Sequence, residues 1–281
     1  PKPRVCQMFP FTLVGTPDGV YVGTSFFCTS VRENSGRPLV EHTPWLEGMV
    51  ARAGRLTQVE PESISLRPGV LTNWQDYLNW EGQLLSRPIT HSLLACAHSR
   101  PLGLLAAWNQ ECGVELQVVG RLVASATYAV IKLFLCEARP ERVQTFDDAF
   151  LNEQALDLEE FSWRGTWNQL QESLCLDFEG DLRRWSDMQI HRKYLIASGH
   201  VLDNLWTLAL VPPFVRCLTV LYAHREKQPA SRLHFYQALE QAELHLGSNS
   251  LRLARLTPHF SAHLLETLGS LSSKGEEQKS R

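Results

Sequence analysis

The pattern of apolar and polar residues changes along the chain. Short apolar runs alternate with polar residues in the N-terminal half, whereas apolar residues recur at three- and four-residue spacing in the C-terminal half. Residues 1–145 also hold eleven of the 17 glycines and eleven of the 15 prolines. Both residues interrupt regular structure, which favours short strands and loops there. We therefore predict an α+β protein, with a β-rich N-terminal half containing two hairpins and an all-helical C-terminal half.

The first predicted hairpin lies close to the N-terminus. An apolar run over 11–14 is followed by Thr16-Pro17-Asp18-Gly19 and by a second apolar run over 20–22. Proline presets φ at the first central position of a turn and glycine takes a positive φ without strain, so this sequence favours a tight reversal. Residues 26–28, Phe-Phe-Cys, are expected to continue the returning strand.

A loop and a helix are predicted after this hairpin. Asparagine, serine, glycine and proline are frequent over 33–44, which indicates a surface loop. Trp74, Tyr77 and Leu78 recur at three- and four-residue spacing, which predicts an amphipathic helix over about 72–86.

The second predicted hairpin lies near the middle of the chain. It joins an apolar run over 102–108 to the alternating residues 114–118. The following apolar run, 122–136, is ambiguous, because its β-branched residues favour a strand and its alanines favour a helix. We expect a helix over 123–130 and a strand over 130–136.

Helical spacing dominates the C-terminal half. The predicted helices are 154–176, 186–211, 214–224, 230–246 and 257–268. Ser186 is expected to cap the second of these helices, and Pro212-Pro213 to end it, because proline lacks a backbone N–H. The chain is thus expected to form a β-rich region over 1–145, a helical region over 146–268 packed on it, and a disordered polar tail over 269–281.

Composition narrows the class of protein. The chain has 281 residues, is 44% hydrophobic and carries 27 basic and 30 acidic side chains, so it has no overall attraction to polyanions. Its seven cysteines contain no Cys-x-x-Cys pair, which indicates a reducing compartment, the cytoplasm or nucleus. The uncharged apolar stretches 122–131 and 204–215 are shorter than the roughly 18 residues that span a bilayer, so no membrane span is expected.

The sequence offers little evidence for catalysis or metal binding. His91, Cys96, His98 and Cys112 are the densest group of soft ligands, but Cys96 and His98 are separated by one residue rather than the two to four typical of zinc sites. Cys112 lies on a predicted turn, where a nucleophile could be exposed, but the adjacent Glu111 would raise its pKa. We therefore expect no metal, no cofactor and no enzyme activity. A Cys/His-dependent hydrolase remains an alternative.

One local cluster of basic residues could hold a phosphate. Arg183, Arg184, Arg192 and Lys193 surround Trp185 within one short segment, 183–193. Arginine and lysine bind phosphates and tryptophan can stack on a base, which would suit a nucleic-acid-associated factor. The alternative is the solvated face of an amphipathic helix, balanced by nearby acidic residues, and binding of nucleic acid is therefore not the favoured function.

The aromatic residues favour protein–protein interaction. The chain has eight tryptophans, and tryptophan is enriched at the energetic centres of interfaces. Trp45 lies in the predicted proline-containing loop, and Trp80 follows a polar residue on the less apolar side of its helix. We predict that Trp45 and Trp80, with Tyr77, are exposed and bind a partner. The predicted function is that of a non-catalytic subunit or adaptor, in a hetero-oligomeric complex of the cytoplasm or nucleus.

Overall fold

The computed structural model describes most of the chain. The described residues are 8–53, 59–87, 89, 93, 114–136, 140–152, 154–172, 178–197, 199–246 and 261–270. Contacts divide the chain into two compact units. Unit 1 comprises 1–119, 183–206 and 257–281, and unit 2 comprises 120–182 and 207–256. This division does not coincide with the predicted boundary after residue 145, because the chain returns to unit 1 with residues 183–206.

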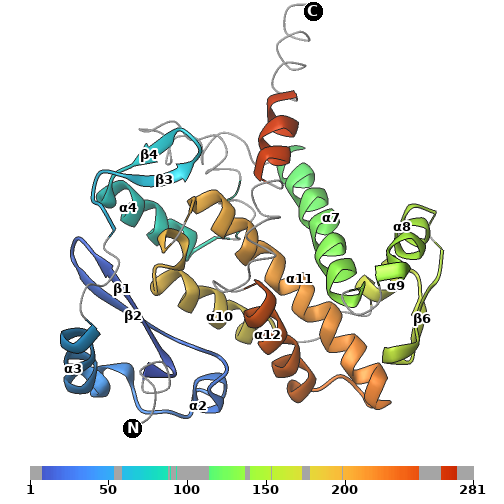
Figure 1. The fold of residues 1–281 in the computed structure, drawn as a ribbon, viewed down its shortest axis with the longest axis horizontal. Coiled ribbons are helices and arrows are strands. Elements are labelled where there is room, and N and C mark those ends of the chain that lie inside the picture. The colour runs from blue at the N-terminus through green and yellow to red at the C-terminus, as the bar shows by residue number, and fades with distance from the viewer. Residues whose placement is uncertain are drawn as a thin grey trace, which may run out of the picture. The chain divides into compact units, whose positions relative to one another are not determined.

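The protein has an α+β fold, as predicted (Figure 1). Within the described residues the strands form three separate antiparallel hairpins, which are β1 (Phe11–Thr16) with β2 (Gly19–Thr24), β3 (Ile64–Arg67) with β4 (Val70–Thr72), and β5 (Leu156–Leu158) with β6 (Trp163–Gly165). The first two hairpins belong to the N-terminal half, and the third interrupts a C-terminal half that otherwise consists of helices and their connections.

The first hairpin has the predicted turn. Thr16 pairs with Gly19, whose φ is 148°, so Pro17 and Asp18 form the two-residue connection. The hydroxyl of Thr16 donates to the Asp18 carboxylate over 2.7 Å. The predicted continuation of the strand over 26–28 is wrong. These residues turn, and Phe26 is buried at the start of the reversal into helix α2 (Thr29–Arg32).

Residues 39–53 are helical, where a loop was predicted up to residue 44. A 3-10 helix, η1 (Leu39–His42), leads into α3 (Thr43–Ala53). Pro44 lies in the first turn of α3, where the missing N–H costs nothing because the first four N–H groups of a helix have no intrahelical acceptor. The Thr43 hydroxyl donates to the carbonyl of Val40 over 2.7 Å and joins the two helices. The loop predicted from the proline content up to residue 44 is therefore wrong, because its last residues begin a helix.

The predicted helix over 72–86 is confirmed as α4 (Trp74–Leu84). The side chain of Asn73 accepts from the N–H of Asp76 over 2.9 Å and caps the helix. Its buried residues are Trp74, Tyr77, Trp80, Glu81 and Leu84, which repeat every three to four positions along one face. This face contributes much of the aromatic core of unit 1.

A single long helix replaces several predicted elements in the middle of the chain. Helix α7 (Val114–Cys136) includes 114–118 and 130–136, which were both predicted as strands. Residues 102–108, the other half of the predicted hairpin, lie outside the described residues. Five alternating residues fit the strand period by chance, whereas the buried residues Val119, Ala126 and Val130 are seven and four positions apart, as one face of a helix requires.

Helices make up most of the remaining chain. They are η2 (Pro140–Arg142), α8 (Val143–Leu151), η3 (Glu159–Phe161), α9 (Trp167–Glu172), α10 (Glu179–His191), η4 (Tyr194–Ile196), α11 (Val201–Glu226) and α12 (Arg232–Leu246), and residues 261–270 are also helical. The prediction for 230–246 is confirmed by α12. The continuous helix predicted over 154–176 is wrong, because Ser162 adopts a left-handed conformation with φ 52° between η3 and β6.

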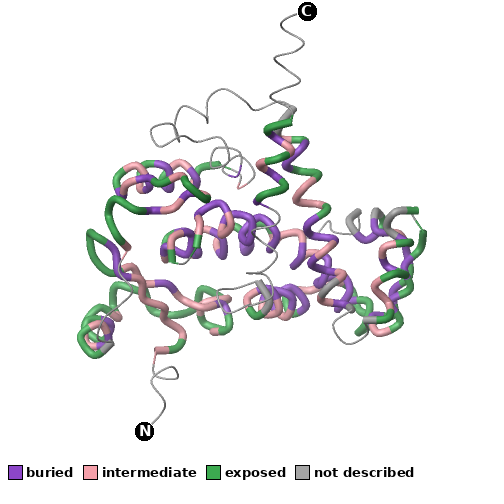
Figure 2. Tube along the Cα trace, turned by 45° about the horizontal axis from the view of Figure 1, so that its top comes forward, coloured by how far each residue is buried: buried purple, intermediate pink, exposed green. Residues whose placement is uncertain are grey.

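Helix α11 passes through Pro212-Pro213, which were expected to end it, and Ser186 lies inside α10 instead of capping a helix. Fully buried side chains flank the two prolines, including Leu210 and Phe214, and their burial compensates for the two missing N–H groups. By length and hydropathy α11 could cross a membrane, but 83% of its most apolar window is buried inside the protein, as in the core helix of a globular domain. Figure 2 shows this burial along the chain.

Candidate protein-interaction site

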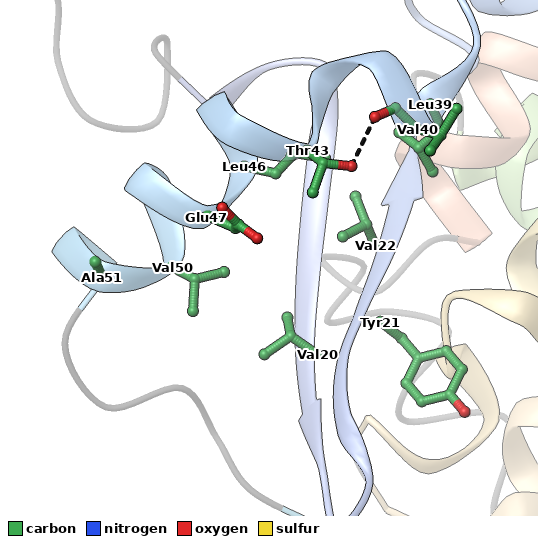
Figure 3. A pocket seen from close by; sticks show the side chains of 10 residues that line it. All are labelled: Val20, Tyr21, Val22, Leu39, Val40, Thr43, Leu46, Glu47, Val50 and Ala51. Carbon is green, nitrogen blue, oxygen red and sulfur yellow. Dashed lines mark hydrogen bonds between the residues drawn. The ribbon is translucent and has the colours of Figure 1, made fainter.

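The site with the clearest geometry is a groove of about 680 Å³ in unit 1, between strand β2 and the helices η1 and α3 (Figure 3). Its walls are mostly aliphatic, and the lining residues are Val20, Tyr21, Val22, Leu39, Val40, Thr43, Leu46, Glu47, Val50 and Ala51. We call this the N-terminal groove.

Strand β2 forms one wall of the groove through three consecutive residues. Successive side chains of a strand point to opposite faces, so Val20 and Val22 share one face and Tyr21 points to the other. Figure 3 shows the Tyr21 ring directed away from α3. On the face shared with Val22, the ring of Phe11 on β1 lies 5.2 Å from the Trp45 ring of α3 and 5.4 Å from the ring of His42. These ring contacts hold α3 against the hairpin.

Several apolar side chains around the groove are exposed to solvent. Val40 is 75% exposed, and Leu39 and Val20 are exposed as well. Trp45, predicted from the sequence as a partner-binding residue, is 41% exposed on α3; its ring packs on Phe11, and it is not one of the residues that line the groove. A cluster of exposed aliphatic and aromatic groups of this kind is typical of a surface that binds another molecule.

The opposite face of β2 rests on a buried ion pair. Lys193 is 2% exposed, and its ammonium bonds to the carboxylate of Glu81 on α4. The same ammonium lies 4.1 Å from the centre of the Tyr21 ring and 5.5 Å from that of Trp74, within the range of cation–π attraction. The hydroxyl of Tyr77 donates to the other carboxylate oxygen of Glu81 over 2.6 Å. We call these five side chains the Lys193 cluster.

The ionisation of the tyrosines reflects this environment. Burial, together with the hydrogen bond to Asp18 and the charges of Asp18 and Glu81, raises the pKa of Tyr21 to about 12. Burial and the neighbouring Glu81 carboxylate also raise the pKa of Tyr77 well above its ordinary value. Both hydroxyls therefore remain protonated and act as hydrogen-bond donors at neutral pH.

The structure does not expose the other two predicted partner-binding residues. Tyr77 is 0% exposed and Trp80 is 1% exposed, so neither side chain has a surface to present to a partner, and the prediction that they are exposed is wrong. The helical spacing of Tyr77, Trp80 and Leu84 already placed them on one stripe. The polar neighbour Asn79 was given more weight than that spacing.

The predicted basic cluster is dispersed by the fold. Arg183 donates to the carbonyl of Leu85 over 2.7 Å, and Arg184 donates to the carbonyl of Arg32. Arg192 lies 5.6 Å from the centre of the Tyr194 ring, and Lys193 is buried in its own cluster. These side chains are engaged with different parts of the protein, so they do not together form the phosphate site that the sequence suggested.

The thiol and metal candidates find no support in the described part of the chain. His91, Cys96, His98 and Cys112 lie outside the described residues. Within the described ranges no group of three or more His, Cys, Asp or Glu side chains could hold a metal ion. Cys217 is a free cysteine, and burial raises the pKa of its thiol to about 12, which keeps it protonated and unreactive.

Two serine–histidine pairs were not foreseen. The Ser65 hydroxyl lies 2.6 Å from Nδ1 of His200, and no described carboxylate bonds to the other ring nitrogen of that histidine. The hydroxyl of Ser231 lies 3.1 Å from Nδ1 of His234, whose Nε2 lies 3.1 Å from Glu226. The backbone N–H of Ser231 donates to the same Nδ1, so this second arrangement is the cap of helix α12.

Comparisons with protein-family models, with curated proteins and with solved structures found no match to this chain. The function must therefore be argued from the residues of the site alone. The N-terminal groove was not predicted from the sequence. Its parts, the alternating Val20 and Val22 and the apolar pair Leu39-Val40, are nevertheless visible there.

Proposed function

We propose that this protein is a non-catalytic subunit or adaptor that binds a partner protein through the N-terminal groove. The observation that carries the proposal is the apolar, solvent-accessible groove, in which Val40 is exposed, together with the exposed Trp45 on the helix that forms one of its walls. Exposed apolar surface of this kind is costly in water, and a partner that covers it gains the free energy of its burial. Trp45, exposed on the same helix, supplies an aromatic side chain of the type that dominates binding energy in interfaces.

The polar groups of the groove favour a protein partner over a small molecule. Sites for small ligands combine apolar walls with a few free polar groups that fix the orientation of the ligand. Here the hydroxyl of Thr43 already donates to the carbonyl of Val40, and Glu47 contributes a single carboxylate to the lining. Broad apolar contact without such orienting groups suits a side-chain surface of another protein.

The proposed partner belongs to a different chain in a complex of the cytoplasm or nucleus. The exposed apolar groove supports a partner, and so a hetero-oligomer is proposed rather than an isolated monomer. The cysteine pattern supports the compartment, since an odd number of thiols without close pairs suits a reducing environment.

Affinity capture from cells that contain the protein tests the proposal. Proteins bound by the wild-type chain are quantified by mass spectrometry beside those bound by Val40→Glu and Trp45→Ala. We expect at least tenfold weaker capture of a specific partner by both variants, with melting temperatures within a few degrees of wild type. Leu233→Glu is the matched control, because Leu233 is also exposed but lies on α12 in unit 2. Equal capture by all three variants would refute the proposal.

A further inference from the structure

We infer that Lys193 is a positioning residue for the N-terminal groove: its buried ammonium holds the back of strand β2 and thereby sets the wall against which a partner binds. The inference rests on the proposed function, because it concerns the geometry of the same groove. It assigns a binding role to a residue that touches neither the groove nor its occupant.

The first step of the argument is the alternation along β2. Val20 and Val22 face the groove and Tyr21 faces the Lys193 cluster, so one peptide segment joins the binding surface to the buried charge. A shift of the Tyr21 ring displaces the two flanking valines directly. The ring is fixed at its far end, because its hydroxyl donates to the Asp18 carboxylate over 3.1 Å.

The second step is that the chain around Lys193 fits tightly against the backbone of β2. A Cβ atom added to Gly23 would lie 2.4 Å from Cβ of Arg192, so no side chain fits at this position. Arg192 and Lys193 therefore pack closely against the face of β2 that carries Tyr21 and Gly23, opposite Val20 and Val22.

The third step is the backbone conformation of Lys193. Its φ is 64°, in the left-handed region that residues other than glycine rarely adopt. Such a conformation costs free energy and persists only where surrounding contacts fix it, and strained positions of this kind concentrate at functional sites. The contacts that fix it here are the ion pair with Glu81 and the rings of Tyr21 and Trp74.

The ion pair gives more than stability to this arrangement. A buried pair often contributes little net stability compared with apolar residues of similar volume, but it specifies one geometry because both charges must remain paired. The cation attracts the face of the Tyr21 ring, which an apolar side chain of the same size would contact without a preferred direction. The ammonium of Lys193 therefore fixes the position of β2. A strand that forms one wall of a binding groove requires such a fixed position.

The test separates position from stability. In the double variant Lys193→Met/Glu81→Leu both buried charges are replaced by apolar groups, so the core remains filled and no unpaired charge is left; the Tyr77 hydroxyl alone loses its acceptor. Lys132→Met is the matched control, because it removes a lysine that pairs with Asp147 over 2.6 Å in unit 2. The probe is a twelve-residue peptide, selected from a displayed random library, that binds the wild-type chain and not Val40→Glu.

We expect the double variant to remain folded, with a melting temperature lowered only by the unpaired Tyr77 hydroxyl and well above the melting temperature of Lys193→Met, but to bind the peptide at least tenfold more weakly. Amide hydrogen exchange at Tyr21 and Gly23 should accelerate at least tenfold in this variant, while exchange in α4 stays unchanged. Lys132→Met should show neither effect.

Two results would overturn the inference. One is wild-type affinity for the peptide in the double variant. The other is unchanged exchange at Tyr21 and Gly23, which also decides the matter if the library yields no peptide dependent on Val40. Failure of the proposed function is recognised separately, because it requires that Val40→Glu leave partner capture unchanged.

Discussion

Replacement of Lys193 by methionine should destabilise unit 1 strongly. The substitution leaves the carboxylate of Glu81 buried beside Tyr77 without its cation. Removing one partner of a buried ion pair costs about 3 to 5 kcal/mol, because the remaining charge is neither hydrated nor neutralised. Methionine keeps the volume of the lysine stem, so little of this loss comes from a cavity.

A double-mutant cycle isolates the charge interaction from packing. Glu81→Leu alone should lose at least as much, since it leaves the ammonium of Lys193 unpaired and the buried Tyr77 hydroxyl without its acceptor, whereas the double variant should lose only about 1 to 3 kcal/mol, for that hydroxyl. The coupling free energy, which is the loss in the double variant minus the two single losses, should therefore be about twice as large as the loss in Lys193→Met. A single domain is stable by only about 5 to 15 kcal/mol, so either single loss is readily measured.

The assay is urea unfolding combined with amide hydrogen exchange. Exchange in α4 and in the β1–β2 hairpin reports the free energy of opening in unit 1, and exchange in α12 serves as an internal reference in unit 2. A loss below 1 kcal/mol in Lys193→Met would refute the reasoning, because it would mean that the ammonium is hydrated in the native protein. Additive single losses in the double variant would show that the two side chains do not interact.

Three further predictions concern other parts of unit 1. Gly23→Ala should lower the free energy of unfolding by about 1 to 3 kcal/mol, because the new Cβ would overlap its neighbour, whereas Gly82→Ala in α4, with nothing within 4 Å, should be neutral or stabilising by up to about 1 kcal/mol; urea unfolding of both measures the contrast. Leu205→Ala should lower the free energy of unfolding by about 2 to 5 kcal/mol in the same assay, since Leu205 is fully buried. A loss below about 0.5 kcal/mol would contradict that burial. The pKa of Tyr21 is raised from 10.0 to about 12, so the protonated hydroxyl stabilises the fold below pH 10 and this contribution disappears as the pH rises toward 12; absorbance at 295 nm should show this tyrosine ionising late, and Tyr21→Phe should remove that step.

The candidate site was only partly visible in the sequence. Trp45 was identified correctly as a tryptophan outside the core, but the reason given, a proline-containing loop, was wrong, because Trp45 lies on helix α3. Tyr77 and Trp80 were assigned to the surface from the polarity of a neighbour, although their spacing placed them on the buried stripe of α4. A helical period identifies a stripe, but the residues outside the helix decide which stripe is covered.

The basic residues illustrate the same limit. Lys193 and Arg192 are adjacent in the sequence and were grouped as one patch, but the lysine is buried against Glu81, more than one hundred residues away in sequence. Charge along a chain does not reveal burial, because a charged side chain can be buried only where a distant partner compensates for its lost hydration.

Turns, helix caps and short amphipathic helices could be predicted from the sequence, because each depends on residues close together in the chain. The tight turn of the β1–β2 hairpin, the capped helix α4 and helix α12 follow from residues that lie within a few positions of one another. Turn residues, caps and amphipathic spacing act over such distances, so their effect does not depend on the rest of the fold.

Tertiary contacts govern the segments whose local preferences are weak or are overcome. The β-branched run in α7 and the double proline in α11 both became helix, because burial of apolar side chains along each helix outweighs the local preference. The N-terminal groove and the Lys193 cluster arise in the same way, since each brings together segments distant in the sequence. Burial depends on contacts between such segments, and the pattern of a single segment does not contain that information.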